Sequence, residues 1–485
     1  MLTAGIKQIR AMEQRSIASG VPEYELMRRA GIGVANWIAA RYSDASRMVI
    51  LCGGGNNGGD ALVAAAELSR KFPVEIFSTK ALNSFTGCAA NAASDLPGEI
   101  PFYHRNNLDA ALFRPGDVII DGLLGIGFAG GTLRPEVKSF IHAANRSGCP
   151  VVALDLPSGI NGDTGSASPD GAIHAAVTLT FGRPKMGLFA GDGSELRGAL
   201  RVIEIGLTGV DHDGMEIMTN VDAVAMLPHW NLSCHKNSRG RVLLWVGSEE
   251  YPGAAELAVS GAMRGGAGMV RVASVAQLRL PSAAIVRHLA GGETPKEWFP
   301  MSGVLVCGCG WGSCGTAENL SAAWRFPGTV LLDADALNTL ACHPEILQPR
   351  ENLILTPHPG EAARLAQTFN VDIALNRKDF ALALAEKAGA VVVLKGRDSV
   401  VAAPDGRCRI IAAGSPALAV AGSGDVLAGV IGAVASQLSD PFDAASLGAY
   451  LHGIAGENAP GILIADELPE QVGRVIRAVA ANKIF

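Results

Sequence analysis

Residues 48–68 read MVILCGGGNNGGDALVAAAEL, an apolar run, a glycine-rich turn and an alanine-rich segment in immediate succession. The apolar run, 48–52, is of the kind that a fully buried parallel strand requires, and residues 60–68 have the composition of a helix. Glycines between the two let the backbone turn sharply and direct several N–H groups to the start of the helix, where an anion can bind. The stretch therefore predicts a strand–turn–helix unit of a parallel α/β sheet.

The spacing of Gly53, Gly55 and Gly58 matches the fingerprint of dinucleotide-binding turns. That fingerprint also needs an acidic residue about 20 residues further on, at the end of the next strand, to hold a ribose. The next apolar run, VEIFSTK, has Glu75 inside it and ends in Lys80. An ordinary nicotinamide-dependent dehydrogenase is therefore not favoured. A glycine turn that merely closes a strand–helix connection is the alternative to a ligand-binding loop.

The composition is that of a globular chain with more than one domain. Its 485 residues exceed the usual domain size of about 100–200, so two or three domains are expected. Hydrophobic residues make up 48% and charged residues 18%, and the 59 glycines indicate many tight loops between buried strands. The net charge of −6 argues against nucleic-acid and anionic-membrane partners, so anionic ligands need local binding sites.

Cysteine usage indicates a cytoplasmic protein. Cys307, Cys309 and Cys314 cluster in CGCGWGSC, but no histidine lies beside them, which favours structural thiols over a metal site. An odd number of cysteines, nine, without a signal peptide fits a reducing compartment. No apolar run is long enough to span a bilayer. We therefore expect a cytoplasmic location and no membrane partner.

Two successions of strand-like runs alternate with helical segments, the pattern of parallel sheets covered by helices. The first comprises MVILC, VEIF, DVIID, VVALDL, VTLTF and RVIEIG, and the second RVLLWVG, MVRVAS, GVLVCG, TVLLDAD, NLILT and AVVVLKG. The segment between them, LTGVDHDGMEIMTNVDAVAMLPHW, loses this pattern. We therefore predict two α/β domains, over 1–218 and 222–485, with the boundary near Asn220.

Polar residues follow three runs of the first domain, at the strand ends where ligands of open α/β sheets gather. They are Asn56, Asn57 and Asp60 after the first, Asp121 and the segment 125–131 after the second, and Asp155 and Ser158 after the third. Asp121 and Asp155 each end a buried strand, where an ionised carboxylate is costly unless it is paired, hydrogen-bonded or bound to a cation. No basic residue is adjacent to either in the sequence. Metal binding or proton transfer is predicted, with a loop-capping carboxylate as the alternative.

The motifs GGGNNGGDALVAA, DGLLGIG, LDLPSGINGDTG and TLTFGRPKMGL, together with LMRRAG, resemble those of the NAD(P)H-hydrate epimerase domain over most of residues 1–215. The resemblance implies a Rossmann-like three-layer fold. It also implies a substrate, NADHX or NADPHX, that is the hydrated, damaged form of the reduced cofactor. A potassium ion is implied at Asn57, Asp121 and Ser158, with Asp155 as the catalytic residue at the reacting ring.

The resemblance further implies the residues that bind this substrate. They are Asn56, Asn57, Gly58, Gly59, Asp60, Gly125, Ile126, Gly127, Phe128, Ala129, Gly130, Gly131 and Asp155. The hydroxyl at C6 of the hydrated ring is next to a nitrogen that can expel it, so epimerisation needs an acid–base group and charge stabilisation. Two positions depart from the family pattern. Ala61 stands where glycine is common and is expected to narrow the cradle, and Arg28 stands where an acidic residue is usual.

In the second domain, AVAGSGDVLAGVIGAVASQL, 419–438, opens a helix with Gly422, Ser423, Gly424 and Asp425. Backbone N–H groups at such a helix start suit a phosphate charge, and an aspartate there can take a proton from a hydroxyl nucleophile. The alternative is that Asp425 only caps the helix.

Three further strand ends of this domain carry charged residues. They are Lys395 and Arg397 in VVVLKGRDS, His358 and Glu361 in LTPHPGE, and Asp333 and Asp335 in LLDADAL. The basic pair predicts a contact with a nucleotide phosphate, with a solvated basic turn as the alternative. His358, between two prolines, is either a ligand-binding residue or a satisfied loop histidine.

The stretches HKNSRGRVLLWVGS, YPGAAELA, LLDADALN, LTPHPGE, VLKGRDSVV and AGSGDVLAGVIGA resemble the NAD(P)H-hydrate dehydratase domain over nearly all of residues 222–485. The resemblance implies a ribokinase-like fold and two sets of binding residues. The adenine nucleotide would contact Lys395, Gly396, Arg397, Asp398, Ser399 and Gly424, and the hydrate would contact Ala254, Gly310, His358 and Asp425. Asp425 would be the base. Asn237 replaces a family glycine, and Ser423 replaces the commoner threonine.

The implied reaction phosphorylates the C6 hydroxyl at the expense of ADP or ATP, after which the ring nitrogen expels phosphate. Magnesium is expected with the nucleotide. Both domains together imply a bifunctional repair enzyme that interconverts the R and S hydrates and dehydrates the S form. A homo-oligomer is expected.

Two alternatives remain open. One is a ribokinase-like kinase of a small vitamin-type alcohol with an accessory nucleotide-binding domain, although a kinase needs no partner that carries GNNGGD and DLPSG. The other is a first domain that acts as a sensor without catalysis, against which Asp60, Asp121, Asp155 and Ser158 argue. The choices between ADP and ATP, and between NADHX and NADPHX, have no basis in individual residues.

Overall fold

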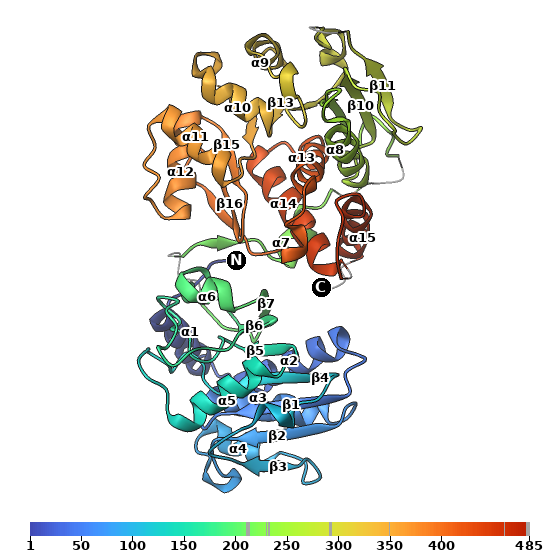
Figure 1. The fold of residues 1–485 in the computed structure, drawn as a ribbon. Coiled ribbons are helices and arrows are strands. Elements are labelled where there is room, and N and C mark those ends of the chain that lie inside the picture. The colour runs from blue at the N-terminus through green and yellow to red at the C-terminus, as the bar shows by residue number, and fades with distance from the viewer. Residues whose placement is uncertain are drawn as a thin grey trace. The chain divides into compact units, whose positions relative to one another are not determined.

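The computed structural model describes residues 1–209, 214–228, 230, 233–290, 293–348, 350–459 and 461–481. The chain forms two compact units, Leu2–Met215 and Glu216–Phe485, and Met1 belongs to the second. Each unit contains one sheet covered by helices (Figure 1). The assignment of separate activities to 1–218 and 222–485 stays a prediction.

A seven-stranded parallel sheet forms the first unit. Its strands are β1 Arg47–Cys52, β2 Val74–Ser78, β3 Phe102–His104, β4 Asp117–Gly122, β5 Val151–Leu154, β6 Val177–Phe181 and β7 Ala199–Ile203. Their order is β3-β2-β1-β4-β5-β6-β7, so the chain changes direction between β1 and β4. This is the doubly wound Rossmann order, in which ligands bind outside the carboxyl ends of the strands at that switch point. The predicted Rossmann-like fold is confirmed.

Helices cover both faces of this sheet. They are α1 Ile6–Ala18, α2 Glu23–Arg41, α3 Asn56–Leu68, α4 Cys88–Ser94, α5 Pro135–Arg146 and α6 Gly191–Leu196, with 3₁₀ turns η1 Leu82–Ser84, η2 Ala110–Leu112 and η3 Met186–Phe189. Met48, Ile50 and Cys52 of β1 pack with α2, α3 and α4, whereas Val49 and Leu51 pack with α5. Burial of both faces explains why the run is apolar at every position rather than alternating.

A ten-stranded sheet forms the second unit. Its strands are β8 Glu216–Ile217, β9 Arg241–Trp245, β10 Met269–Ser274, β11 Ile285–His288, β12 Val304–Cys307, β13 Thr329–Leu332, β14 Leu353–Leu355, β15 Val391–Leu394, β16 Ser399–Ala402 and β17 Cys408–Ile411. Their order is β11-β10-β9-β12-β13-β14-β15-β16-β17-β8. The strands from β11 to β15 are parallel, and β16 runs antiparallel to β15 and β17. The switch point lies between β9 and β12.

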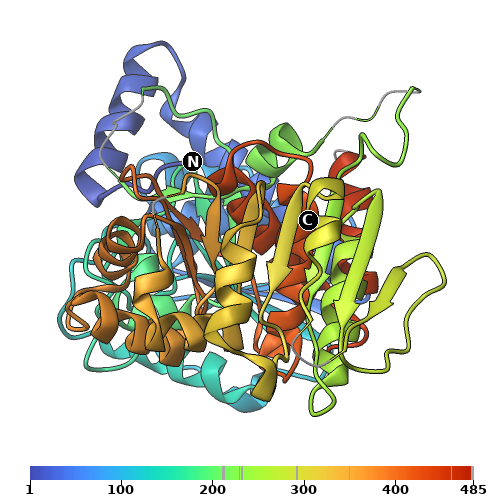
Figure 2. The ribbon, with the colours of Figure 1, turned by 90° about the horizontal axis from the view of Figure 1, so that it is seen from above.

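Two helical layers enclose this second sheet. The helices are α7 Asn220–Met226, α8 Pro252–Arg264, α9 Ala317–Trp324, α10 Asp335–Cys342, α11 Pro359–Phe369, α12 Arg377–Ala388, α13 Ser423–Ala435, α14 Pro441–Asn458 and α15 Leu468–Ala480, with 3₁₀ turns η4 Lys296–Met301, η5 Gly312–Cys314, η6 Pro344–Ile346 and η7 Pro416–Leu418. One core joins α8, α13, α14 and α15 to the sheet, and a second joins α9 to α12 to its other face. Figure 2 shows the gold and orange helices of this second layer in front of the strands.

Every apolar run predicted to be a strand is a strand in this structure, and β3, β8, β11, β16 and β17 lie outside those runs. Both sheets therefore have more strands than the sequence predicted, by one in the first sheet and by four in the second. Among the described residues, none of the helices combines the length and the apolar character needed to cross a membrane.

Candidate active sites

A cavity of about 730 Å³ lies at the carboxyl ends of β1 and β4, at the switch point of the first sheet. Segments that follow β1, β4, β5 and β6 line it together with α1 and α2. The predicted substrate-binding residues among its lining are Asn56, Asn57, Asp60, Gly125, Ile126, Gly127, Phe128 and Asp155. The structure thus brings most of the predicted set into one cavity.

The end of the predicted segment 125–131 does not line this cavity. The Ala129 carbonyl accepts a hydrogen bond from Asn161 Nδ2 at 2.7 Å, and the Gly131 carbonyl accepts one from Ser168 Oγ at 2.8 Å. These bonds tie the segment to the loop after β5. Substrate contacts of Ala129, Gly130 and Gly131 stay a prediction.

The glycine-rich turn is shorter than the sequence indicated, because α3 begins at Asn56 rather than at Asp60. Gly59 N donates to the Gly55 carbonyl at 3.1 Å, so the helical bonds start inside the glycine run. A Cβ on Gly53 would lie 1.9 Å from the Leu123 carbonyl oxygen, and one on Gly58 would lie 1.9 Å from the Gly53 carbonyl oxygen. These two glycines are therefore required by close backbone packing.

Two departures from the family pattern have local explanations. Ala61 is fully buried, and a Cβ on Gly122 would lie 2.5 Å from its methyl group, so Ala61 packs between α3 and β4. It is not part of the cavity lining, and the expectation that it narrows the cradle is wrong. Arg28 is half-exposed and forms an ion pair with Glu25 at 3.1 Å.

The predicted potassium ligands lie together beside the cavity, whose wall includes Asn57. Asp121 accepts hydrogen bonds from Ser158 Oγ at 2.6 Å and Ser158 N at 2.9 Å. Asn57 Nδ2 donates to the Leu124 carbonyl at 2.9 Å, and Leu124 N donates to Ser158 Oγ at 2.8 Å. Asn57 Oδ1 is buried without a hydrogen-bond partner. A buried oxygen that accepts no hydrogen bond and lies among other oxygen atoms is what a cation site requires.

Burial raises the pKa of Asp121 to about 6, while its hydrogen bonds from Ser158 and Leu123 oppose the shift. Its side chain is completely inaccessible to solvent. A cation beside this carboxyl would favour the ionised form.

Asp155, at the end of β5, is paired with a lysine that sequence reasoning missed. Lys185 Nζ donates to Asp155 Oδ1 and also to the Phe181 carbonyl at 3.0 Å. Phe181 N donates to the same carboxylate oxygen at 3.1 Å. Asp155 has a left-handed backbone with φ of 65°, a strained conformation that clusters at functional sites. The absence of a basic neighbour in the sequence was therefore misleading, since the partner lies 30 residues further along.

Three other carboxyls line this cavity, among them Asp60 from α3 and Glu13 from α1. Burial raises the pKa of Asp60 well above its ordinary value, with Asp155 and Glu13 adding to the shift and Lys185 opposing it. Burial also raises the pKa of Glu13. The cavity therefore combines one lysine–carboxylate pair with carboxyls that favour the neutral form.

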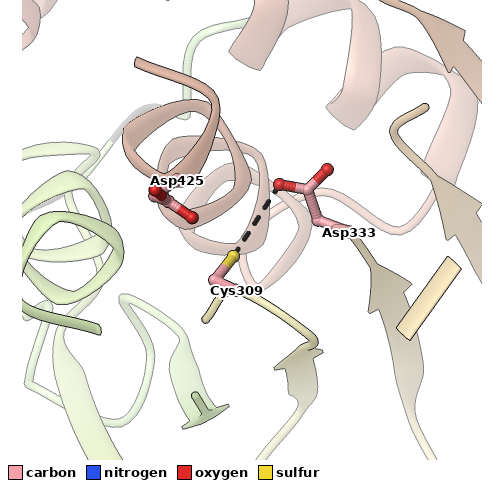
Figure 3. Close-up of side chains that lie close together, drawn as sticks. All are labelled: Cys309, Asp333 and Asp425. Carbon is pink, nitrogen blue, oxygen red and sulfur yellow. Dashed lines mark hydrogen bonds between the residues drawn. The ribbon is translucent and has the colours of Figure 1, made fainter. Parts of the chain in front are cut away.

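In the second unit, Asp425 lies in the first turn of α13 and faces the ends of β12 and β13 (Figure 3). Gly422, the residue before the helix, has φ of 91°, which favours glycine. Cys309 Sγ donates to Asp333 Oδ2 at 3.8 Å. Ligand atoms of Cys309, Asp333 and Asp425 lie within 4.8 Å of one another.

Lys395, at the end of β15, points into this cluster. Its Nζ donates to Asp333 Oδ1 at 2.7 Å and lies 4.0 Å from Glu361 Oε2. Thr356 Oγ1 donates to the same Asp333 oxygen at 2.8 Å. A Cβ on Gly424 would be 3.4 Å from the ammonium. The predicted nucleotide-binding residues Lys395 and Gly424 are therefore neighbours.

The cluster shifts the ionisation of its members. Burial raises the pKa of Asp425 to about 7, Asp333 adds to the shift, and Cys309 and Lys395 oppose it. Burial alone would lower the pKa of Lys395, but Asp333 and Glu361 outweigh it and the net shift is upward. A carboxyl poised near neutral pH suits a general base.

Two predicted hydrate-binding residues touch each other. Gly310 follows β12 with φ of 63°, and a Cβ there would lie 2.7 Å from the Ala254 methyl group and 2.8 Å from the Tyr251 carbonyl oxygen. Ala254 lies in the first turn of α8. The structure brings the two residues together beside the switch point of the second sheet.

His358 forms hydrogen bonds with residues close to it in the sequence. It precedes α11, and its Nδ1 accepts a hydrogen bond from Gly360 N at 3.0 Å, while His358 N donates to Glu361 Oε2 at 2.8 Å. Its side chain is half-exposed. A helix-capping role is therefore established, and contact with the hydrate stays a prediction.

The remaining predicted nucleotide-binding residues form the turn between β15 and β16. Gly396 has φ of 144°, and Asp398 has a left-handed backbone with φ of 51°. Ser399 Oγ donates to the Gly396 carbonyl at 3.0 Å. Arg397 and Asp398 sit in the same turn. Their contacts with a nucleotide stay predictions.

The Cys309–Asp333–Asp425 cluster does not fit a magnesium cage. Asp333 is already compensated by Lys395, and a thiol is not a ligand that Mg²⁺ prefers. Cys309 and Cys307 are buried, as expected for structural thiols, and burial raises the pKa of both.

Known protein families match the two structural units of the chain separately. A family described as NAD(P)H-hydrate dehydratase matches residues 242–476, and one described as YjeF-related protein N-terminus matches residues 23–187. The bifunctional NAD(P)H-hydrate repair enzyme Nnr of Coxiella burnetii is 34% identical over 485 residues, which are 96% of this chain and 97% of that protein. The corresponding enzyme of Escherichia coli is 35% identical over 452 residues, 90% of this chain and 85% of that protein.

The chain belongs to the family of bifunctional NAD(P)H-hydrate repair enzymes.

A solved structure agrees with the fold of the second unit of this repair enzyme. A ribokinase-like superfamily protein of Enterococcus faecalis covers 56% of this chain and 99% of its own, with a TM-score of 0.50 and 18% identity. The predicted ribokinase-like fold is therefore confirmed. An ADP/ATP-dependent NAD(P)H-hydrate dehydratase of Bacillus subtilis, co-crystallised with ATP/Mg²⁺, covers 55% of this chain and 99% of its own with 29% identity and a TM-score of 0.45.

Sequence reasoning about this repair enzyme missed Lys185, Glu13 and the proximity of Cys309 to Asp425. Lys185 lies inside the quoted motif TLTFGRPKMGL, so its position was available, but its partner was not. Glu13 lies in an amphipathic N-terminal segment with no motif of its own. Only the fold shows that α1 reaches the cavity.

Proposed function

We propose that this chain repairs hydrated nicotinamide cofactors in two steps, one in each unit. The first unit interconverts the R and S epimers of NADHX and NADPHX. The second dehydrates the S epimer to NADH or NADPH at the expense of ADP or ATP, releasing AMP or ADP and phosphate. The observation that carries the proposal is a pair of aspartates, Asp155 and Asp425, each at the carboxyl edge of its own sheet with a lysine nearby.

Asp155 is the proposed acid–base residue of epimerisation. The ring nitrogen of the hydrate expels the C6 hydroxyl, and water then adds to the resulting cation from either face. Asp155 receives the proton of that water, because three donors hold its carboxylate at the wall of the cavity. Asn56 and the segment Gly125–Phe128 on the same cavity wall would orient the dinucleotide.

A potassium ion is proposed at Asn57, Asp121 and Ser158. The free Asn57 Oδ1 and the buried Asp121 carboxylate support it, since both lack a compensating cation among the described residues. When bound, the ion supplies positive charge near the substrate phosphates or ring. The chain itself contributes the hydrogen bonds that connect the loops after β1, β4 and β5 and fix their positions relative to one another.

Asp425 is the proposed base of the dehydratase step. It takes the proton of the C6 hydroxyl, whose oxygen attacks the terminal phosphorus of ADP or ATP and displaces AMP or ADP. The ring nitrogen then expels phosphate, a better leaving group than hydroxide, and the resulting cation loses a proton from C5 to water or to the released phosphate, which restores the dihydronicotinamide ring. The N-terminal N–H groups of α13 and the ammonium of Lys395 stabilise negative charge on the transferred group.

Magnesium is proposed to enter with the nucleotide, held by phosphate oxygens and water rather than by a preformed protein cage. A cytoplasmic location is proposed because all nine cysteines of the chain are free. We propose that the enzyme forms a homo-oligomer, which size-exclusion chromatography with light scattering would test.

The proposal is tested by absorbance at 340 nm after the protein is added to mixed R and S NADHX with ADP, with ATP or with no nucleotide. We expect recovery of more NADH than the S fraction contains, faster than spontaneous epimerisation allows. The nucleotide that supports recovery is the phosphoryl donor. No recovery with either nucleotide would contradict the proposal and favour a kinase of another alcohol.

A further inference from the structure

The cavity of the first unit contains two aspartates with opposite surroundings. Asp155 accepts hydrogen bonds from Lys185 Nζ, from Phe181 N at 3.1 Å and from Thr180 Oγ1 at 3.4 Å. Asp60 is buried to nine-tenths, and within the described residues no hydrogen bond or ion pair reaches its carboxyl. The two side chains nonetheless line the same cavity.

One lysine compensates one carboxylate. The Lys185 side chain is 1% exposed, and its ammonium is saturated by Asp155, Thr180 Oγ1 and the Phe181 carbonyl. A second ionised carboxylate in this cavity would be uncompensated, which is costly at such burial. Burial without a compensating cation therefore favours the neutral form of Asp60 and raises its pKa.

Other charged groups around the cavity do not change this assignment. Glu13 from α1 disfavours a negative charge on Asp60, and Glu23 from α2 adds another acidic side chain to the cavity lining. Arg10, Lys80 and Arg134 also line the cavity, but none forms an ion pair with Asp60 in the part of the chain that the structure describes. The surroundings of Asp60 thus favour a neutral carboxyl in the cavity wall, and such a carboxyl can donate a hydrogen bond.

We propose that Asp60 and Asp155 are an acid–base pair for epimerisation and that Lys185 is the positioning residue that fixes which of them starts ionised. The inference rests on the proposed epimerase function and deepens it by assigning the acid. Family resemblance gave Asp60 only a binding role and gave Lys185 none.

The proton balance of the step is complete. Asp60 gives its proton to the C6 hydroxyl oxygen, the C6–O bond breaks, and the lone pair of the ring nitrogen forms a C=N bond. Water attacks C6 from the other face, the C=N electron pair returns to nitrogen, and Asp155 receives the proton of that water. Asp60 ends ionised and Asp155 neutral, which is the starting state for the reverse inversion, and exchange with water restores the first state.

The test uses the full-length chain and compares the R and S epimers of NADHX with ADP in excess. The S epimer reports the dehydratase alone and therefore controls for the amount of active second unit, while thermal unfolding followed by circular dichroism controls for the fold of the first unit. With the R epimer, D60N is expected to lower kcat of epimerisation by about 10²–10⁴-fold with little change in KM, because a general acid is lost while binding remains. D60E, which keeps the acid, is expected to recover part of the rate.

Lys185 is tested by K185M and K185R. K185M is expected to lower kcat of epimerisation with little change in KM, and K185R to restore kcat in part. A purely structural lysine would instead change thermal stability without this selective effect on kcat. Lys138, which forms an ion pair with Asp170 at 2.7 Å on the surface of the same unit, provides the matched control, K138M. This control is expected to keep the wild-type rate.

Expulsion of the hydroxyl also predicts that each inversion in ¹⁸O-water places one solvent oxygen on C6, which mass spectrometry of recovered hydrate detects. The assignment of Asp60 as the acid would be overturned if D60N epimerised the hydrate at the wild-type rate. It would also be overturned if E13Q lost epimerisation while D60N kept it. Inversion without ¹⁸O uptake would overturn the step itself. A wild-type chain that cannot use the R epimer would contradict the proposed function instead.

Discussion

Asp425 combines deep burial with a negative neighbour, and its reactivity follows from both. Burial raises its pKa to about 7, Asp333 adds to the shift, and Cys309 and Lys395 oppose it. Because a base must be ionised to accept a proton, we expect kcat/KM for the S hydrate to fall as pH drops through about 7, by up to tenfold per pH unit. A pH profile of initial rates, corrected for spontaneous decay of the hydrate, measures this. A flat profile through this range would contradict the assignment.

Replacing this carboxyl separates the two activities. Asp425→Asn should lower the dehydratase rate by about 10²–10⁴-fold, since an amide cannot accept the hydroxyl proton. Epimerisation, followed by chromatography of the hydrate without nucleotide, should keep its wild-type rate. Dehydration that survives the substitution would show that another group is the base.

The sequence allowed individual site residues to be predicted, but not which residues contact each other in the fold. Asp121 and Asp155 could be identified because a carboxylate at the end of an apolar run is unusual, and Asp425 because it follows a glycine turn at the start of a helix. The partner of Asp155 could not, because Lys185 reaches it only through the pairing of β5 with β6. Ala61 was misassigned for the same reason, since its contact with Gly122 exists only once α3 lies on β4.

The start of α3 is the element on which the first cavity depends. Gly53→Ala and Gly58→Ala each place a methyl group 1.9 Å from a backbone oxygen, so the turn between β1 and α3 must shift. We expect each to destabilise the first unit by about 1–3 kcal/mol and to lower epimerisation strongly. Thermal unfolding followed by circular dichroism, with dehydratase activity as the internal control, measures the effect.

Gly55→Ala is the matched control for this prediction. Gly55 is in the same turn, has φ of −104° and has no atom within 4 Å of an added Cβ. The unfolding temperature of this variant should equal that of the wild type. Equal losses in all three variants would show that chain flexibility, rather than close packing, explains the glycines.

Strand prediction failed at three of the four sheet edges, all except β7, and the reason is physical. Central parallel strands such as β1 and β12 are buried on both faces, so every residue is apolar and the run is conspicuous. β3, β8 and β11 are edge strands, and β16 and β17 lie next to the β8 edge. Edge strands are short and partly exposed, as in β11, and polar residues interrupt their pattern.

At the scale of the whole molecule, the account requires two sites that work independently and share only a freely diffusing hydrate. A mixture of Asp155→Asn and Asp425→Asn chains should therefore convert the R hydrate to NADH, although neither variant alone does so above the spontaneous rate. The rise of absorbance at 340 nm measures this complementation. Failure of the mixture, with each remaining activity intact, would mean that the hydrate must pass within one chain.

We expect one chain to perform both reactions, and purified R-NADHX is the substrate that decides this. With wild-type protein and ADP or ATP, absorbance at 340 nm should rise until the R hydrate is fully converted, at a rate well above spontaneous epimerisation. Full conversion would establish epimerase and dehydratase activity in a single measurement. Conversion limited to the spontaneous rate, while S-NADHX reacts rapidly, would show that the first unit is not an epimerase and would contradict the account.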